Sequence, residues 1–130
     1  MNEIERDPDE QSYATAFSQA VGSGDYLRAK TILHEHPSLV CWSDAEGNTL
    51  LHTTRDEVAV RLLTRAGANP NCTNLEGMTP LHWAAIVGDI SWADALIRCG
   101  TKVDAVDSAE WTALHSAAAC AGPGMVSVLL

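Results

Sequence analysis

Apolar residues recur along this chain at helical spacing, in short segments that glycines and polar turns separate. The most regular segment begins at Thr79-Pro80, where a threonine suits a helix N-cap and a proline suits the first turn. Apolar positions on one face follow as far as Val87, and Gly88 then interrupts the pattern. A second apolar segment runs from Ile90 to Ile97 and ends at Gly100, after which the residues favour an extended conformation. The pattern predicts a unit of helix, turn, helix and extended hairpin.

Three stretches of the chain are versions of the same short sequence. They are Gly47-Asn-Thr-Leu-Leu-His52, Gly77-Met-Thr-Pro-Leu-His-Trp-Ala-Ala85 and Glu110-Trp-Thr-Ala-Leu-His-Ser-Ala-Ala118. A fainter copy is Thr15-Ala-Phe-Ser-Gln-Ala-Val21. A period of about 30 to 34 residues indicates a stacked-repeat architecture, in which each unit buries its apolar face against its neighbours.

The unit from Asn74 to Asp104 resembles an ankyrin repeat over its whole length. It has the Gly-x-Thr-Pro-Leu-His-x-Ala-Ala block, the Gly-Asp turn between helices and the trailing glycine of that family. The resemblance covers about residues 12–130. It implies an all-α ankyrin-repeat solenoid of stacked helix-turn-helix units with short β-hairpin connections. We expect an acidic, disordered tail over residues 1–11, followed by four repeats at about 12–43, 44–73, 74–106 and 107–130.

The first, second and last units depart from the regular pattern. In the first we expect an inner helix around Thr15–Val21 and an outer helix around Tyr26–Glu35. The second unit is three residues short after His52, so we expect its inner helix to be about one turn long. The segment Met125–Leu130 is apolar and has no polar cap. Because solenoids need a polar terminal unit for solubility, we expect either a longer array, or a partner or self-association that covers this end. The alternative is a complete short protein with a frayed last helix.

Composition and charge limit which classes of partner and which cellular location we expect. The formal net charge is −9 and the pI is about 4.7, which argues against nucleic acid and anionic membranes, because both bind basic surfaces. No apolar run has transmembrane length and the acidic N-terminus does not resemble a signal peptide, so we expect a cytoplasmic protein, with a nuclear location as an alternative. The four cysteines form no close pair, which favours reduced thiols over a zinc site: Cys41, Cys72, Cys99 and Cys120.

The recurring histidines are the residues that most resemble catalytic or metal-binding groups. They occur once per repeat, and stacked units lie about 10 Å apart, so they cannot share one metal ion. The ankyrin resemblance implies that each ties a hairpin to a helix, with the threonine three residues earlier as its partner: Thr49/His52, Thr79/His82 and Thr112/His115. The sequence contains no nucleophile motif, phosphate loop or helical zinc motif. We therefore predict no catalytic residue, no metal and no cofactor.

The remaining candidate site is the surface that ankyrin arrays commonly use, formed by hairpin tips and the exposed face of the inner helices. Trp111 is notable there, because tryptophan is frequent at binding hot spots. The acidic residues Asp44 and Glu46 belong to the same edge. We expect this surface to bind a protein or peptide with apolar anchors and basic flanks, through Leu75, Glu76, Met78, Trp83, Ile86, Glu110 and Trp111.

Alternatives remain for one of these residues and for the function. The alternative for Trp83 is packing between inner helices, because tryptophan is common at that position in the family, and for Trp42 and Trp92 we favour core packing. The leading functional hypothesis is a non-enzymatic interaction module that belongs to a longer adaptor or scaffold protein. The alternative is a stand-alone inhibitor that docks on an enzyme, because four repeats with a short second inner helix resemble the ankyrin-type inhibitors of cyclin-dependent kinases.

Overall fold

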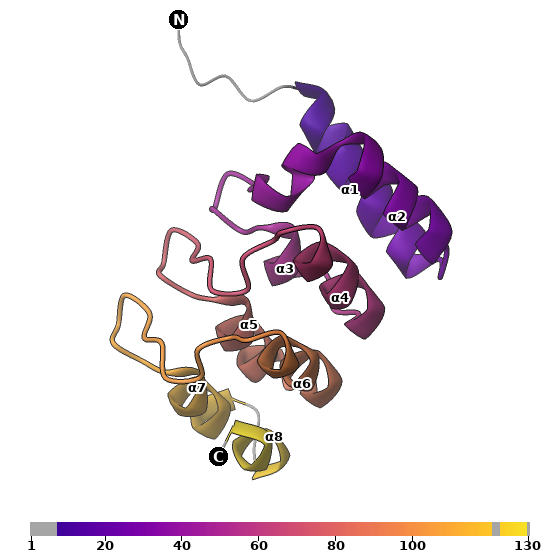
Figure 1. The fold of residues 1–130 in the computed structure, drawn as a ribbon. Helices are drawn as coiled ribbons and strands as arrows, with labels where there is room; N and C mark the ends of the chain where they lie inside the picture. Colours follow the sequence, from indigo (N-terminus) through magenta and orange to yellow (C-terminus); the bar gives the residue numbers. More distant parts are fainter. Residues whose placement is uncertain (1–7, 121–122, 130) are drawn as a thin grey trace, which may run out of the picture.

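The computed structural model describes residues 8–120 and 123–129. Its helices form consecutive antiparallel pairs that stack in chain order, with the connecting loops projecting on one side (Figure 1). The elements are α1 (Pro8–Gly22), α2 (Tyr26–Glu35), the 3-10 helix η1 (Pro37–Cys41), α3 (Leu50–Thr53), α4 (Glu57–Arg65), α5 (Pro80–Val87), α6 (Ile90–Arg98), α7 (Ala113–Cys120) and α8 (Pro123–Leu129).

Two helix predictions agree closely with the structure. Helix α2 occupies Tyr26–Glu35, the range expected for the first outer helix. Helix α3 is only four residues long, Leu50–Thr53, because the second repeat lacks the residues that would extend it. The regular helix-turn-helix unit is therefore confirmed, together with its local shortening.

The N-terminal boundary differs from the prediction. Helix α1 begins at Pro8, whereas we expected a disordered tail as far as residue 11. A proline suits the first turn of a helix, and acidic side chains are favourable near its positive end. The Ser38 hydroxyl also donates to the Glu10 carboxylate at 3.0 Å, which ties this first turn to η1. The rest of the predicted tail, residues 1–7, lies outside the described residues.

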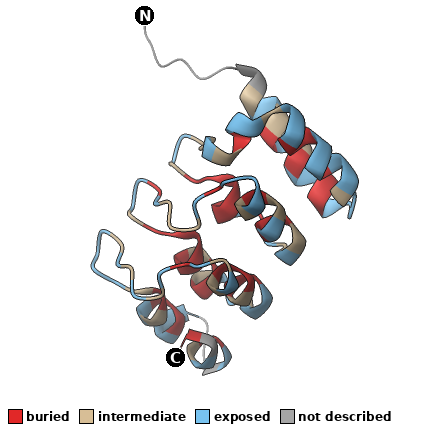
Figure 2. Cartoon of the chain, in the orientation of Figure 1, coloured by how far each residue is buried: buried red, intermediate tan, exposed pale blue. Residues whose placement is uncertain are grey.

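The core lies between an inner layer of helices α1, α3, α5 and α7 and an outer layer of α2, α4, α6 and α8. Figure 2 shows buried residues on the helix sides that face neighbouring helices, and exposed residues at the loop tips. The largest fully buried side chains include Phe17, Leu51, Leu81, Trp92 and Met125. Trp92 thus packs in the core as expected, and Trp42 is partly buried against it.

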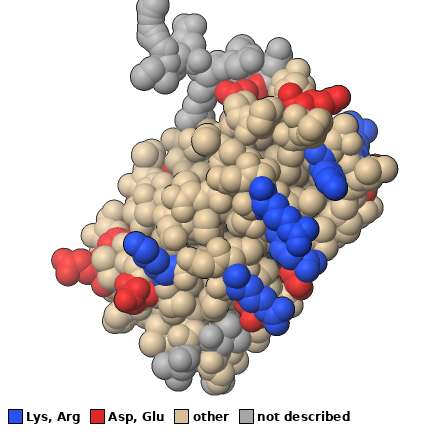
Figure 3. All heavy atoms as spheres, in the orientation of Figure 1, with Lys and Arg blue, Asp and Glu red and all other residues tan. Residues whose placement is uncertain are grey.

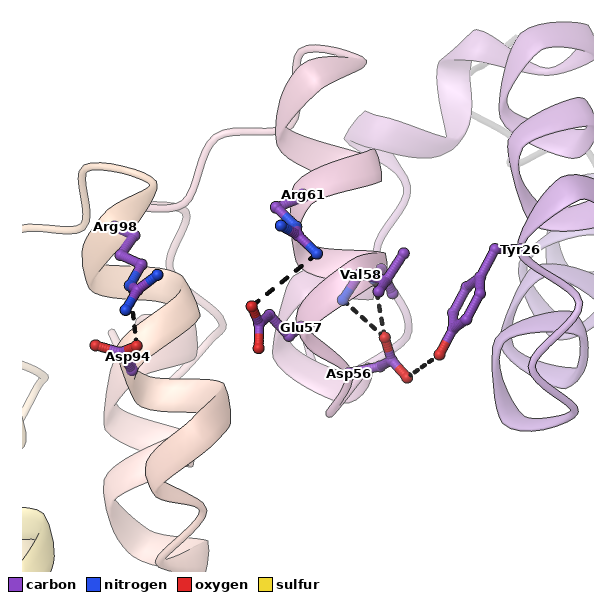
Figure 4. Close-up of polar contacts among 8 residues, drawn as sticks. Tyr26, Asp56, Glu57, Val58, Arg61, Asp94 and Arg98 are labelled. Atoms are coloured by element: carbon purple, nitrogen blue, oxygen red, sulfur yellow. Dashed lines mark hydrogen bonds and ion pairs between the residues drawn. The ribbon is translucent and has the colours of Figure 1, made fainter.

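Each of the outer helices α2, α4 and α6 begins at an aspartate whose side chain accepts backbone N–H bonds, which stabilises a helix N-terminus. These caps also join neighbouring repeats. The Tyr26 hydroxyl donates to the cap carboxylate of Asp56 at 2.8 Å (Figure 4), and this hydrogen bond raises the pKa of Tyr26. Arg55 pairs with the next cap, Asp89, at 3.3 Å. The outer-helix termini are therefore linked from repeat to repeat.

Candidate functional site

The three loops that join repeats are tight turns built on one acidic or amide side chain each. In the third repeat the Asn74 Oδ1 accepts the N–H groups of Glu76 and Met78, at 2.9 and 3.0 Å. Asp44 and Asp107 make the equivalent pairs of bonds in the second and fourth repeats. Among the described residues the hairpins contain an isolated bridge, Ser43 with Thr49, but no strand. The predicted β-hairpins are thus present as turns too short for strands.

The hairpins stack side by side and form one continuous edge, on the side where the loops project in Figure 1. The Leu75 N–H donates to the Glu46 carbonyl at 3.0 Å, and the Ser108 N–H donates to the Glu76 carbonyl at 2.9 Å. We call residues 44–48, 74–78 and 107–111 the hairpin edge. Backbone bonds of this kind fix the spacing of the tips, so the hairpin edge is a pre-formed surface.

Glycines at the tips allow this close stacking in two of the three hairpins. Gly47 and Gly77 have φ values of 81° and 74°, in the left-handed region that favours glycine. A Cβ at Gly77 would lie 2.9 Å from the Ser108 backbone nitrogen of the next hairpin. The equivalent residue in the third hairpin, which belongs to the fourth repeat, is Glu110, with φ 64°. A non-glycine residue held there carries backbone strain, of about 1–2 kcal/mol.

Two of the three Thr–His pairs make the bonds between helix and hairpin that the ankyrin resemblance implied. The Thr79 N–H donates to Nδ1 of His82 at 3.1 Å, and the Thr79 hydroxyl lies 2.9 Å from the same nitrogen. On the other side of the ring, Nε2 lies 2.8 Å from the Trp111 carbonyl. His52 makes the same bonds to Thr49 and to the Met78 carbonyl. Each of these two rings therefore ties an inner helix to the hairpin of the following repeat.

These contacts also assign the proton on the rings. Because a backbone N–H donates to Nδ1, the hydrogen of the neutral ring is on Nε2 and donates to the carbonyl. A second proton on Nδ1 would face the Thr49 N–H in the case of His52. Burial lowers the pKa of His52, although the Met78 carbonyl and Asp44 partly oppose this effect and His82 adds to it. The neutral form of His52 is the one that fits the fold.

His115 differs from the other two histidines. It keeps the bonds to Thr112, with Nδ1 at 3.1 Å from the backbone nitrogen and 2.8 Å from the hydroxyl. It is exposed, and within residues 8–120 and 123–129 its Nε2 has no hydrogen-bond partner. Its ring lies 6.1 Å from that of Trp111. The third pair is therefore formed on the threonine side alone.

Four of the predicted binding residues are exposed along the hairpin edge. Leu75 is 77% exposed and Trp111 is 43% exposed, which is unusual for large apolar side chains. Glu76 and Glu110 are exposed beside them. Since neighbouring hairpins are hydrogen-bonded through Glu76 and Ser108, these side chains belong to one surface.

Met78 is not a tip residue, and our expectation that it is exposed was wrong. It is only 8% exposed. Its N–H and carbonyl are both bonded inside the stack, to Asn74 and to His52, so this side of the hairpin turns toward the core. Asp44 is also not a simple rim charge, because its carboxylate holds the turn of its own hairpin.

The two predicted residues on the inner helix α5 are less accessible than the tips. Trp83 is partly buried and packs against the core, as the alternative interpretation expected, and its indole N–H is buried without a partner in the part of the chain that the structure describes. Ile86 is partly buried. Both therefore expose only part of their side chain.

One exposed apolar residue beside the hairpin edge was missed from the sequence. Val106 is 52% exposed just before the hairpin of the fourth repeat. The turn-forming role of Asp44, Asn74 and Asp107 was also missed. Each lies five residues before the threonine of its Thr–His pair, so alignment of the repeats would have found them.

The described residues bring together no group of three histidine, cysteine, aspartate or glutamate side chains that could hold a metal ion. The four cysteines are unpaired thiols. Of the helices described, none combines the length and apolar character needed to cross a membrane.

Comparison with known proteins decides the family. The family described as ankyrin repeats (3 copies) matches residues 53–130, more than half of the chain. The chain belongs to the ankyrin-repeat family. The structure extends the repeat architecture to the α1/α2 pair, which precedes the matched range.

Similar stretches occur in proteins with very different names. The chain is 40% identical over 79 residues to the glycerophosphocholine phosphodiesterase gde1 of Schizosaccharomyces pombe, which is 57% of this chain and 7% of that protein. It is 37% identical over 70 residues to the 26S proteasome non-ATPase regulatory subunit 10 of Dictyostelium discoideum, 53% of this chain and 30% of that protein. It is 37% identical over 62 residues to the mouse RelA-associated inhibitor, 48% of this chain and 8% of that protein. The chain thus spans less than a third of the length of each of these relatives.

Proposed function

We propose that this chain is a non-catalytic protein-binding module, whose hairpin edge holds a partner segment with apolar anchors and flanking Lys or Arg residues. The observation that carries the proposal is the exposure of Leu75 and Trp111 on a rigid, hydrogen-bonded edge. Clustered exposed apolar side chains mark interaction sites, and tryptophan is prominent among binding hot spots. Trp83 and Ile86, both partly buried on α5, extend the same site.

The charge of the edge supports a basic partner. Glu76 and Glu110 are exposed beside the two apolar anchors, and the nearby carboxylates Glu46 and Asp104 are exposed too. Opposite charges across an interface raise the association rate and select the partner. A segment with Lys or Arg on either side of an apolar residue satisfies both features of the edge.

A binding role also accounts for the groups that most resemble catalytic residues. Both ring nitrogens of His52 and His82 are used in bonds that hold the repeats together. The relatives are named as a phosphodiesterase, a proteasome regulatory subunit and an inhibitor, and a repeat segment shared by such different proteins favours an adaptor or scaffold role over a common chemistry.

The proposal is tested by selecting random peptides displayed on phage against the immobilised domain. Enriched peptides should combine an apolar residue with Lys or Arg, and should not bind a Leu75→Ser/Trp111→Ala variant. Leu27→Ser is the matched control, because Leu27 is also 77% exposed but lies on the outer helix α2. Selected peptides that bind the double variant as well as the original chain would place the site elsewhere.

A second function is supported by one specific observation, the one-turn helix α3. Because this shortening resembles the ankyrin-type inhibitors of cyclin-dependent kinases, the alternative is an inhibitor that docks on an enzyme. Adding the purified chain to cyclin-dependent kinases and measuring substrate phosphorylation separates the two functions. Stoichiometric inhibition would favour the inhibitor, and unchanged kinase activity would favour the adaptor.

A further inference from the structure

The outer helices carry a second surface with the opposite charge to that of the hairpin edge. The chain is strongly acidic as a whole, with a net charge of −9. Figure 3 nevertheless shows Lys and Arg side chains gathered in a row across the side formed by α2, α4 and α6. The basic residues on these helices are Arg28, Lys30, Arg61, Arg65 and Arg98.

A hollow of about 370 Å³ lies within this row, between the end of α2 and the end of α4. Its apolar lining comes from Leu33, Pro37, Leu62 and Ala66, and its basic lining comes from Lys30, His34 and Arg65. An apolar floor beside cations suits an apolar side chain next to carboxylates.

A second hollow continues the first toward the C-terminus. It has a volume of about 240 Å³, lies between α4 and α6, and is lined in part by Arg61, Arg65 and Arg98. Arg65 lines both hollows, so they are neighbours across three outer helices, and we call the two together the outer-helix groove. Neighbouring helices lie about 10 Å apart, and the groove therefore spans about 20 Å, or about six residues of extended chain.

Some cations of the groove have an ion-pair partner and others do not. Arg98 pairs with Asp94 at 3.0 Å and Arg61 with Glu57 at 4.0 Å, both within one helix turn (Figure 4). Such exposed pairs contribute little to stability, so a partner can replace them at small cost. Lys30 and Arg65 form no ion pair with any residue that the structure describes. Within the part of the chain that the structure describes, the groove therefore presents two cations, Lys30 and Arg65, that have no ion-pair partner.

We propose that this outer-helix groove binds an acidic segment of a partner protein. One apolar side chain of the segment enters the hollow between α2 and α4, and its carboxylates pair with Lys30 and Arg65 and continue toward Arg61 and Arg98. The apolar lining favours a protein segment over nucleic acid, which would need a broad positive field that a chain of net charge −9 does not provide. The site is separate from the hairpin edge. It binds an acidic segment, whereas the hairpin edge is proposed to bind a basic one.

The test uses a fluorescein-labelled probe peptide, Asp-Glu-Asp-Leu-Glu-Asp-Glu, whose binding is followed by fluorescence anisotropy at low salt. The wild-type chain should bind this peptide in spite of its own net charge, and a peptide with glycine in place of leucine should bind about tenfold more weakly, since burial of the leucine side chain is lost. No measurable binding of the leucine peptide would overturn the proposal.

Two variants locate the binding. Lys30→Glu/Arg65→Glu should weaken binding of the leucine peptide by at least about tenfold, because the charge of both cations is reversed. The matched control Arg28→Glu/Lys102→Glu changes the net charge equally at exposed positions that do not line the groove, and should change affinity by about twofold at most. Equal losses of affinity in both double variants would mean that only the net charge of the chain matters, and this would contradict the proposed site.

A third variant tests the hollow itself. Ala66 is exposed and lines the hollow, so Ala66→Phe fills it without disturbing the core. This variant should bind the leucine and glycine peptides equally, and continued preference for leucine would contradict the assigned pocket. A short single-stranded DNA serves as the competing polyanion. If DNA bound more tightly than the peptide and lost this affinity in Lys30→Glu/Arg65→Glu, the groove would be a nucleic-acid site and the proposal would be wrong.

Discussion

Replacing His82 with alanine should cost much more stability than the same change at His115, although the two residues occupy equivalent positions. His82 is 1% exposed and bonds on both sides of its ring, to Thr79 and to the Trp111 carbonyl. His115 keeps the bonds to Thr112 but is exposed. The two histidines therefore share the same local bonds to a threonine, and they differ in burial and in the bond to a following hairpin.

The magnitude follows from the groups that each substitution leaves behind. In His82→Ala the buried N–H of Thr79 loses its acceptor, which costs about 1–3 kcal/mol. The space of the buried ring adds about 1 kcal/mol, and water can replace the donor to the Trp111 carbonyl at the exposed hairpin. The expected loss is about 2–4 kcal/mol for His82→Ala, against less than about 1 kcal/mol for His115→Ala, where water reaches Thr112.

The assay is urea unfolding followed by circular dichroism and tryptophan fluorescence. Because repeats in a solenoid can unfold separately, amide hydrogen exchange should accompany it. In His82→Ala, protection should fall in α5 and in residues 107–111, which the ring joins. If His115→Ala cost as much as His82→Ala, or if His82→Ala cost less than about 0.5 kcal/mol, the inter-repeat bond would not carry the stability assigned to it.

Three further predictions concern the hairpins and their histidines. Burial lowers the pKa of His52, so as the pH falls below about 6.5 this residue is protonated in the unfolded chain before it is protonated in the folded chain. The free energy of unfolding should therefore be highest above that pH and should decline as the pH falls toward the folded pKa. Urea titrations at several pH values should show a weaker decline in His52→Gln. Glu110→Gly should raise the free energy of unfolding by about 1 kcal/mol by removing left-handed strain, and an unchanged melting temperature would mean that the strain is absent. Gly77→Ala should lower the free energy of unfolding by at least about 1 kcal/mol more than Gly24→Ala. The two glycines have similar φ values, but of the two only Gly77 has atoms of the next hairpin within 4 Å of the added Cβ. Equal losses of stability would contradict the close stacking of the hairpins.

The repeat architecture could be predicted from sequence because each signal is local. Thr79-Pro80 begins a helix, Gly88 ends it, and the same signals recur at a fixed period. The shortened helix α3 was predictable for the same reason, since the deletion lies inside one repeat. The Thr–His bonds came from the resemblance to ankyrin repeats, which already implied their partners.

Exposure at the hairpins could not be predicted residue by residue. Leu75 and Met78 are both apolar and lie three residues apart in the same hairpin, yet one is exposed and the other buried. The difference depends on the fold of the hairpin, in which the N–H of Met78 bonds to Asn74 and its carbonyl bonds to His52 of the preceding repeat. The first turn of α1 likewise makes a contact distant in sequence, between Glu10 and Ser38.

The outer-helix groove was also beyond sequence reasoning. Lys30 and Arg65 lie on different helices, and the sequence shows them only as isolated charges in an acidic chain. The stacking of α2 on α4 brings them to the same hollow. A surface made by the packing of repeats becomes visible only once the register of those repeats is known.

The central claim is that the hairpin edge is the principal partner site, and one affinity ratio tests it most directly. Isothermal titration of the tightest selected peptide should compare the original chain with Trp111→Ala and, as the control, Leu27→Ser. The account predicts that Trp111→Ala weakens binding by about 30-fold, which corresponds to about 2 kcal/mol, while the melting temperature hardly changes and Leu27→Ser binds normally. Full affinity in Trp111→Ala, with a folded protein, would contradict the assignment of the partner site to the hairpin edge.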